Sequence, residues 1–161
     1  MYSWKVSFSS EESPASNNLV SLFTKVEFEK ELMPDIVDID VLFSMAKGDE
    51  GYIPLFTCVC GSFGCGGYYI KVKHIDEGLI LQNSYHPVNN PSEDKLITPF
   101  EHEISWEDLY FILSEVIEYC LHLKKKYPNC GICSGTYGLN IVGNLDQYAA
   151  LLQDVRLRYE E

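Results

Sequence analysis

The sequence predicts an α+β fold in which a mostly antiparallel sheet of about four to six strands, arranged as hairpins or a meander, carries helices on one face. Three observations lead to this prediction. Apolar residues alternate with polar ones in the first half of the chain, they recur at spacings of three and four from residue 105 onwards, and polar or glycine-rich turns separate the strand-like segments. With 161 residues, we expect one domain spanning residues 1–161.

Five segments have the alternating or β-branched and aromatic composition of strands: residues 2–9, 20–29, 52–58, 67–75 and 79–85. The first two are joined by a polar loop and are expected to pair as a hairpin, because consecutive strands usually lie next to each other. The last three are expected to form a meander.

Two further segments are less regular. Residues 35–47 fit both a strand and a helix. We prefer a short helix, because Pro34 suits an early helical position and Gly48 suits the end. Residues 96–104 predict one more strand, which is kinked or lies at a sheet edge because Pro99 has no backbone N–H to donate.

The strongest local signal begins at Ser105, an N-cap residue followed at the third helical position by Asp108. An apolar stripe with helical spacing then predicts a helix over residues 105–126, which ends before Pro128. After a loop over residues 129–138 and a short extended piece at 139–142, a last helix is predicted over residues 145–160. Its N-cap is Asn144, with Gln147 completing a capping box.

The most distinctive motif is a glycine-rich, thiol-rich loop between two predicted strands. It contains Cys58, Cys60 and Cys65, and a second glycine-containing loop carries Cys130 and Cys133. Zinc prefers four thiolate or imidazole ligands on tight loops, so these five cysteines are candidate zinc ligands. The spacing departs from two C-x2-C pairs, however, and five thiols exceed four positions. The alternative is that they are small buried apolar side chains.

An enzymatic role has weaker support, and we favour a protein that is not an enzyme. Cys130 and Cys133 have the C-x-x-C spacing of thiol–disulfide enzymes, but they follow a predicted helix instead of opening one. The sequence has no P-loop, G-x-S-x-G or H-E-x-x-H motif. Pairing of Cys65 with His74 or His86 in space stays open, because nucleophile and base need not be neighbours in sequence.

The net charge of −12 argues against nucleic acid and anionic membranes as partners, and it favours a basic protein partner. The acidic residues are dense in one region: from Glu101 to Glu118 there are six acidic residues and no Lys or Arg. The candidate interaction residues there are Glu101, Glu103, Glu107, Asp108, Glu115 and Glu118. Trp106 and Tyr110 are candidate aromatic anchors, and the alternative for Trp106 is a place in the core. The alternative is a merely solvated face.

The N-terminal residues alternate and lack the apolar core of a signal peptide, and no stretch approaches the length of a membrane helix. We therefore expect a cytoplasmic protein with reduced cysteines.

The hairpin from Cys58 to Gly67, followed by Ile104-Ser-Trp106, resembles a group of uncharacterised bacterial proteins. In its small size and acidity the chain is also similar to immunity proteins, which neutralise secreted toxins. This resemblance implies an inhibitor or immunity-type binding protein. A zinc-stabilised structural or adaptor domain and a cysteine-dependent redox enzyme are the alternatives.

Overall fold

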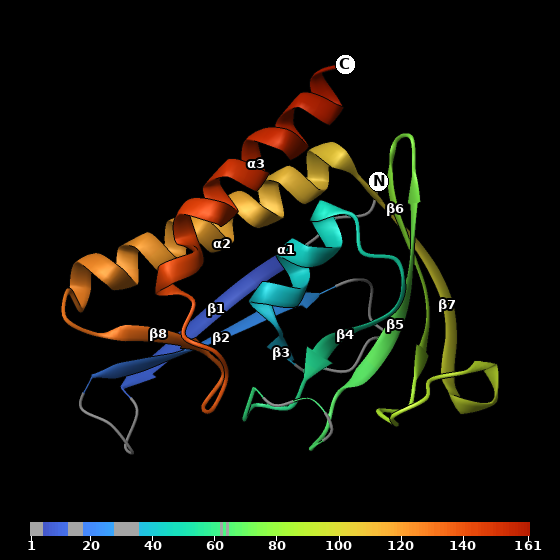
Figure 1. Ribbon diagram of the computed structural model, residues 1–161, viewed down its shortest axis with the longest axis horizontal. Helices are drawn as coiled ribbons and strands as arrows, with labels where there is room; N and C mark the ends of the chain where they lie inside the picture. The colour runs from blue at the N-terminus through green and yellow to red at the C-terminus, as the bar shows by residue number, and fades with distance from the viewer. Residues whose placement is uncertain (1–4, 13–17, 28–35, 62, 64) are drawn as a thin grey trace.

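The computed structural model describes residues 5–12, 18–27, 36–61, 63 and 65–161. It has an α+β fold, as predicted, with two sheets and three α-helices (Figure 1). The expected strand residues 2–4 and 28–29, together with Pro34, lie outside the described residues. No helix in the described part of the chain is both long enough and apolar enough to cross a membrane.

The larger sheet contains five antiparallel strands in the order β3-β4-β5-β6-β7. These are β3 (Ile36–Val37), β4 (Gly51–Thr57), β5 (Tyr68–Ile75), β6 (Gly78–Tyr85) and β7 (Leu96–Ser105). The predicted meander is therefore confirmed. β7 is an edge strand, and its register against β6 shifts near Pro99, opposite Asn83. This agrees with the expectation of a kinked or edge strand.

The smaller sheet pairs β1 (Lys5–Glu12) with β2 (Leu19–Glu27) as the predicted hairpin. Its third strand, β8 (Gly131–Ser134), pairs with β2 in parallel. The prediction that residues 129–138 form only a loop is wrong for this strand. A four-residue strand leaves little periodicity, and its partner β2 lies more than 100 residues earlier in the chain, so the local sequence did not reveal the pairing.

Helix α1 (Ile39–Lys47) resolves the ambiguous segment in favour of the short helix, with the two residues of β3 preceding it. The side chain of Asp38 caps it by accepting a hydrogen bond from the backbone N–H of Val41, at 3.1 Å. Gly48 ends the helix with a positive φ of 148°. The hydroxyl of Ser134, at the end of β8, accepts a hydrogen bond from the Ile39 N–H and so connects the small sheet to α1.

The two long helices also lie where the sequence predicts. Helix α2 (Trp106–Lys126) begins at Ser105, whose hydroxyl accepts a 3.0 Å hydrogen bond from the Asp108 N–H. Helix α3 (Leu145–Glu160) lacks the predicted capping box. The chain enters it from a 3-10 turn (Val142–Asn144), so Asn144 is already helical and its side chain caps nothing. Asn144 instead donates a hydrogen bond to Asp40.

A continuous hydrophobic cluster draws buried side chains from both sheets and all three helices. Helix α2 packs against α3 and also contacts strands of both sheets, and β2 packs beside β3, where the two sheets meet. The loop between β4 and β5, which carries Cys58, Cys60 and Cys65, lies at one end of the molecule, and α1 lies beside α3 (Figure 1).

Candidate functional site

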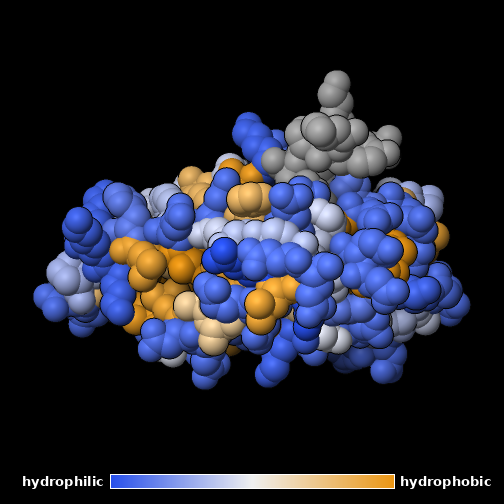
Figure 2. Space-filling model, turned by 90° about the horizontal axis from the view of Figure 1, so that it is seen from above, coloured by the Kyte–Doolittle hydropathy of each residue, from blue (hydrophilic) through white to orange (hydrophobic). Residues whose placement is uncertain are grey.

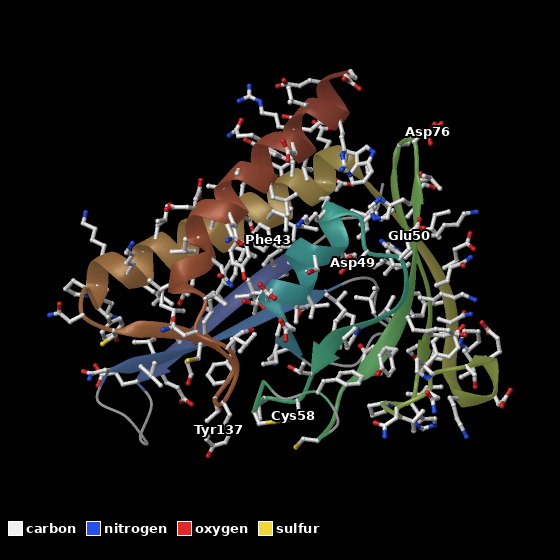
Figure 3. The ribbon with its side chains drawn as sticks, in the orientation of Figure 1. Phe43, Asp49, Glu50, Cys58, Asp76 and Tyr137 are labelled. Carbon is white, nitrogen blue, oxygen red and sulfur yellow. A yellow bond between two sulfur atoms is a disulfide. The ribbon has the colours of Figure 1, made fainter. Side chains whose placement is uncertain are left out.

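The thiol loop, defined as residues 58–67, connects β4 to β5 at one end of the molecule (Figure 3). Its three sulfur atoms, from Cys58, Cys60 and Cys65, lie within 4.8 Å of one another. Cys58 and Cys60 are half-buried and Cys65 is exposed. The structure therefore brings together three of the five candidate zinc ligands.

Cys58 and Cys60 are joined by a disulfide, with their Cα atoms 5.3 Å apart. This separation falls within the ordinary range for disulfides. The expectation that all six cysteines are reduced does not hold for this pair, because the tight turn between them brings both sulfurs together.

The disulfide prevents the loop from binding a metal ion through all three cysteines. A metal ion is bound by thiolates, and Cys58 and Cys60 are not thiolates while they are bonded to each other. Once the disulfide is reduced, the same backbone presents three sulfurs to one point. Three sulfurs this close could hold one metal ion.

The thiol loop packs against the segment that follows β8. The backbone N–H of Tyr137 donates to the Cys60 carbonyl at 2.7 Å, and that of Thr136 donates to the Val59 carbonyl at 3.2 Å. Gly61 and Gly135 meet at this junction, both with positive φ, and a Cβ at Gly135 would lie 2.5 Å from the Gly61 Cα. Only glycine fits at both positions, so the two loops are held in backbone contact.

The other two candidate zinc ligands do not join the group. Cys133 is buried within β8, and Cys130 is half-buried just before that strand, so neither belongs to the sulfur cluster. The thiol loop does contact the region that carries Cys130 and Cys133. The contacts come from the segment Ser134–Gly138, however, and not from the two cysteines. Burial raises the pKa of the Cys133 thiol and also raises that of Cys120 on α2, to about 12, which makes both poor ligands and nucleophiles.

The histidines offer the thiols no base. His74 lies six residues beyond the start of β5, about 20 Å along the strand, and its Nε2 is 3.0 Å from the Met45 carbonyl. His86 lies just after β6, and its backbone N–H donates to the carbonyl of Lys95. Among the described residues, no histidine belongs to the cysteine cluster.

The predicted acidic residues are divided between two elements. Glu101 and Glu103 are exposed on the edge strand β7, where Glu101 accepts a 2.7 Å hydrogen bond from Gln82. Glu107, Glu115 and Glu118 are exposed on α2, and Asp108 is half-buried there. Seen from above, the surface is mainly hydrophilic, with separate apolar patches among the polar side chains (Figure 2).

The two predicted aromatic anchors, Trp106 and Tyr110, are not exposed side chains of α2. Trp106 is 6% exposed, donates a 2.7 Å hydrogen bond to the Asp76 carbonyl and lies beneath the guanidinium of Arg158. Tyr110 is half-buried against Tyr159. The exposed apolar side chains of α2 are Phe111 (55%) and Leu121 (51%). Their position opposite the apolar stripe was the sequence signal that could have identified them.

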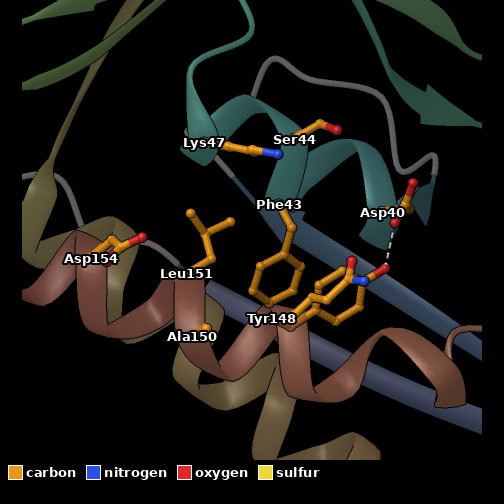
Figure 4. A pocket seen from close by; sticks show the side chains of 9 residues that line it. Asp40, Phe43, Ser44, Lys47, Tyr148, Ala150, Leu151 and Asp154 are labelled. Carbon is orange, nitrogen blue, oxygen red and sulfur yellow. Dashed lines mark hydrogen bonds between the residues drawn. The ribbon is translucent and has the colours of Figure 1, made fainter.

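A groove of about 590 Å³ lies between α1 and α3, and sequence reasoning did not find it (Figure 4). Phe43 and Tyr148 stack in it with ring centroids 4.0 Å apart. The Tyr148 hydroxyl donates a 2.6 Å hydrogen bond to Asp40 Oδ1. Burial and the Asp40 carboxylate raise the pKa of Tyr148, so it is a neutral donor at physiological pH. The lining residues are Asp40, Phe43, Ser44, Lys47, Gln147, Tyr148, Ala150, Leu151 and Asp154.

No family model, curated protein or solved structure matches this chain. The resemblance of the Cys58–Gly67 hairpin to uncharacterised bacterial proteins therefore stays a prediction. The chemistry of the sites rests on the geometry alone: a three-sulfur cluster, an acidic helix face and a groove with an aromatic floor.

Proposed function

We propose that this chain is a protein-binding domain that captures a basic partner through the exposed face of α2. The observation that carries this proposal is one solvent-facing stripe, the α2 stripe, in which carboxylates flank two large apolar side chains. Its members are Glu107, Phe111, Glu115, Glu118 and Leu121.

The helical spacing places these residues on one side of α2. Glu107, Phe111, Glu118 and Leu121 follow one another at intervals of four, seven and three residues, and Glu115 lies one turn after Phe111. The opposite side of the helix is buried in the core. No ion pair among the described residues engages the carboxylates of the stripe. Its negative charge therefore faces solvent.

The stripe combines the two properties that protein interfaces use. Carboxylates steer a cationic partner towards the surface and speed association, and apolar or aromatic anchors hold the complex once it forms. Phe111 is the natural anchor, because more than half of its side-chain surface is exposed. An inhibitor of immunity type, which masks a basic toxin domain, would need such a surface.

The proposal is tested by measuring association kinetics with the product of the gene adjacent to the one that encodes this chain. The wild type should associate more slowly as salt rises, because exposed charges are screened beyond about 8 Å at physiological ionic strength. The pair Glu115→Lys and Glu118→Lys should slow association, and Phe111→Ala should speed dissociation.

A matched control reverses the same number of charges elsewhere, with Glu11→Lys and Glu12→Lys on the exposed part of β1. This pair should change association much less than the α2 pair. Equal association rates at low and high salt, or equal effects of the two charge reversals, would show that the α2 stripe is only a solvated surface.

The three-sulfur cluster favours a second candidate function, a zinc-stabilised loop. Cys58, Cys60 and Cys65 would supply three thiolates in the reduced protein, and the exposure of Cys65 leaves the fourth position accessible to water or to a partner's side chain. Zinc is the expected metal because it is well suited to a set of thiolate ligands.

Zinc content of the reduced protein, measured by elemental analysis after dialysis against zinc, tests this second function. We expect one zinc per chain in the wild type and none in Cys60→Ser, which should also be less stable because metal binding is coupled to folding. Cys130→Ser is the matched control and should retain its zinc, because Cys130 lies outside the sulfur cluster. A reduced wild type without zinc would exclude the site.

A further inference from the structure

The groove between α1 and α3 has an apolar floor between charged ends. Ala150 and Leu151 contribute apolar surface, and the stacked rings of Phe43 and Tyr148 line the groove with only 2% and 5% of their surface exposed. Asp40 and Asp154 lie towards opposite ends (Figure 4). A volume of about 590 Å³ is within the usual range for ligand sites. The groove is partly open to solvent, so it can admit a side chain that is attached to a longer chain.

Asp40 is held in place before any ligand arrives. Its Oδ1 accepts hydrogen bonds from the Tyr148 hydroxyl at 2.6 Å and from the Asn144 amide at 3.4 Å, both from the α3 side of the groove. A carboxylate that two donors already hold in place loses little freedom on meeting a cation.

Lys47 is the one cation among the lining residues, and it leaves the groove with a net charge of −1 when Asp40 and Asp154 are counted. Lys47 is exposed, and no ion pair in the described part of the chain involves it or either aspartate. Within the described residues, no cation therefore neutralises the negative charge of the groove by direct contact.

We propose that this groove binds an arginine or lysine side chain of a peptide segment, with Asp40 as the carboxylate that meets the cation. Arginine and lysine combine an apolar stem with a charged head, which matches an apolar floor that leads to a carboxylate. This inference does not depend on the α2 stripe, because no residue of α2 lines the groove.

The test uses an acetylated, amidated pentapeptide with one arginine between alanines, titrated into the ¹⁵N-labelled protein and followed by NMR. We expect chemical-shift changes at the amides of Phe43, Ser44 and Leu151. The same peptide with citrulline, which keeps the shape of arginine and removes its charge, should bind about tenfold more weakly, a difference of about 1.4 kcal/mol.

Asp40→Asn should weaken binding of the arginine peptide by a similar factor. Asp146→Asn is the matched control, because Asp146 is also an acidic residue in the first turn of a helix but does not line the groove, and it should leave binding unchanged. Shift changes outside the groove, equal binding of the citrulline peptide, or equal binding by Asp40→Asn would overturn the proposal. If acetyl-arginine amide binds as tightly as the peptide, the occupant is a small organic cation and the peptide assignment is wrong.

Discussion

The hydroxyl of Tyr148 on α3 donates a hydrogen bond to Asp40 on α1, across 108 residues of sequence. The same tyrosine ring stacks on Phe43, one turn further along α1. One side chain thus contributes both a polar and an apolar contact between the two helices, and it also shapes the groove that we assign to a cationic side chain.

Tyr148→Phe should lower the free energy of unfolding by about 1 to 2 kcal/mol, because it removes a hydrogen bond to a charged group and keeps the ring stacked. Urea unfolding measures the change. Tyr137→Phe is the control: Tyr137 is 72% exposed, so its loss of a hydroxyl should change stability by less than about 0.5 kcal/mol. Equal effects would show that the bond to Asp40 adds nothing to stability.

The raised pKa of Asp38 leads us to expect that the stability of the protein depends on pH. Burial is the main cause that raises its pKa above the ordinary 3.8, although the hydrogen bond from Val41 opposes it. Between 3.8 and the raised value the folded state binds more protons than the unfolded state, so the unfolding free energy falls as pH rises through this window. The cost of burying the Asp38 charge is present in full above the pKa of the folded state, and it is absent well below pH 3.8, where the side chain is neutral in both states.

Asp38→Asn removes this charge and keeps a side-chain oxygen that can cap α1. At pH 7 the variant should be more stable than the wild type, and the difference should shrink below about pH 4. Urea unfolding at both pH values gives the comparison. A variant that is less stable at pH 7 would show that the charged cap outweighs the cost of burial.

Trp106 and Phe111 lie five residues apart on α2, but truncation should cost much more stability at Trp106 than at Phe111. Trp106→Ala should cost about 3 to 5 kcal/mol of stability, because it empties a core position and removes the bond to Asp76. Phe111→Ala should cost less than about 1 kcal/mol, because the ring is mostly in water. Thermal or urea unfolding separates the two. A large cost for Phe111→Ala would place its role in the fold and weaken its assignment as an interface anchor.

The thiols should react with iodoacetamide in a fixed order. Cys65 is exposed and should be modified first in the native protein at pH 8. Cys120 is fully buried, and burial raises its pKa to about 12, so it should react only on unfolding. Peptide mass spectrometry at timed intervals reads out the order. Modification of Cys120 at the rate of Cys65 would contradict its placement in the core.

Local patterns in the sequence determined most of the secondary structure. The cap at Ser105 and the apolar spacing after it located α2, because a helix buries one face and its start needs a hydrogen-bond acceptor. The alternation in residues 20–29 located β2, because a strand with one buried face has apolar residues at every second position. The convergence of Cys58, Cys60 and Cys65 was also predictable, since a short glycine-rich hairpin loop keeps nearby cysteines close.

Only the tertiary structure decided which distant segments meet. The parallel pairing of β8 with β2, the backbone contact of Gly61 with Gly135 and the bond from Tyr148 to Asp40 all join residues more than 70 positions apart. It also decided that Trp106 is buried and Phe111 exposed, because the packing of α2 fixes which aromatic residue faces the core. A sequence pattern reports the period of one element, whereas the partner of that element depends on the packing of the whole chain.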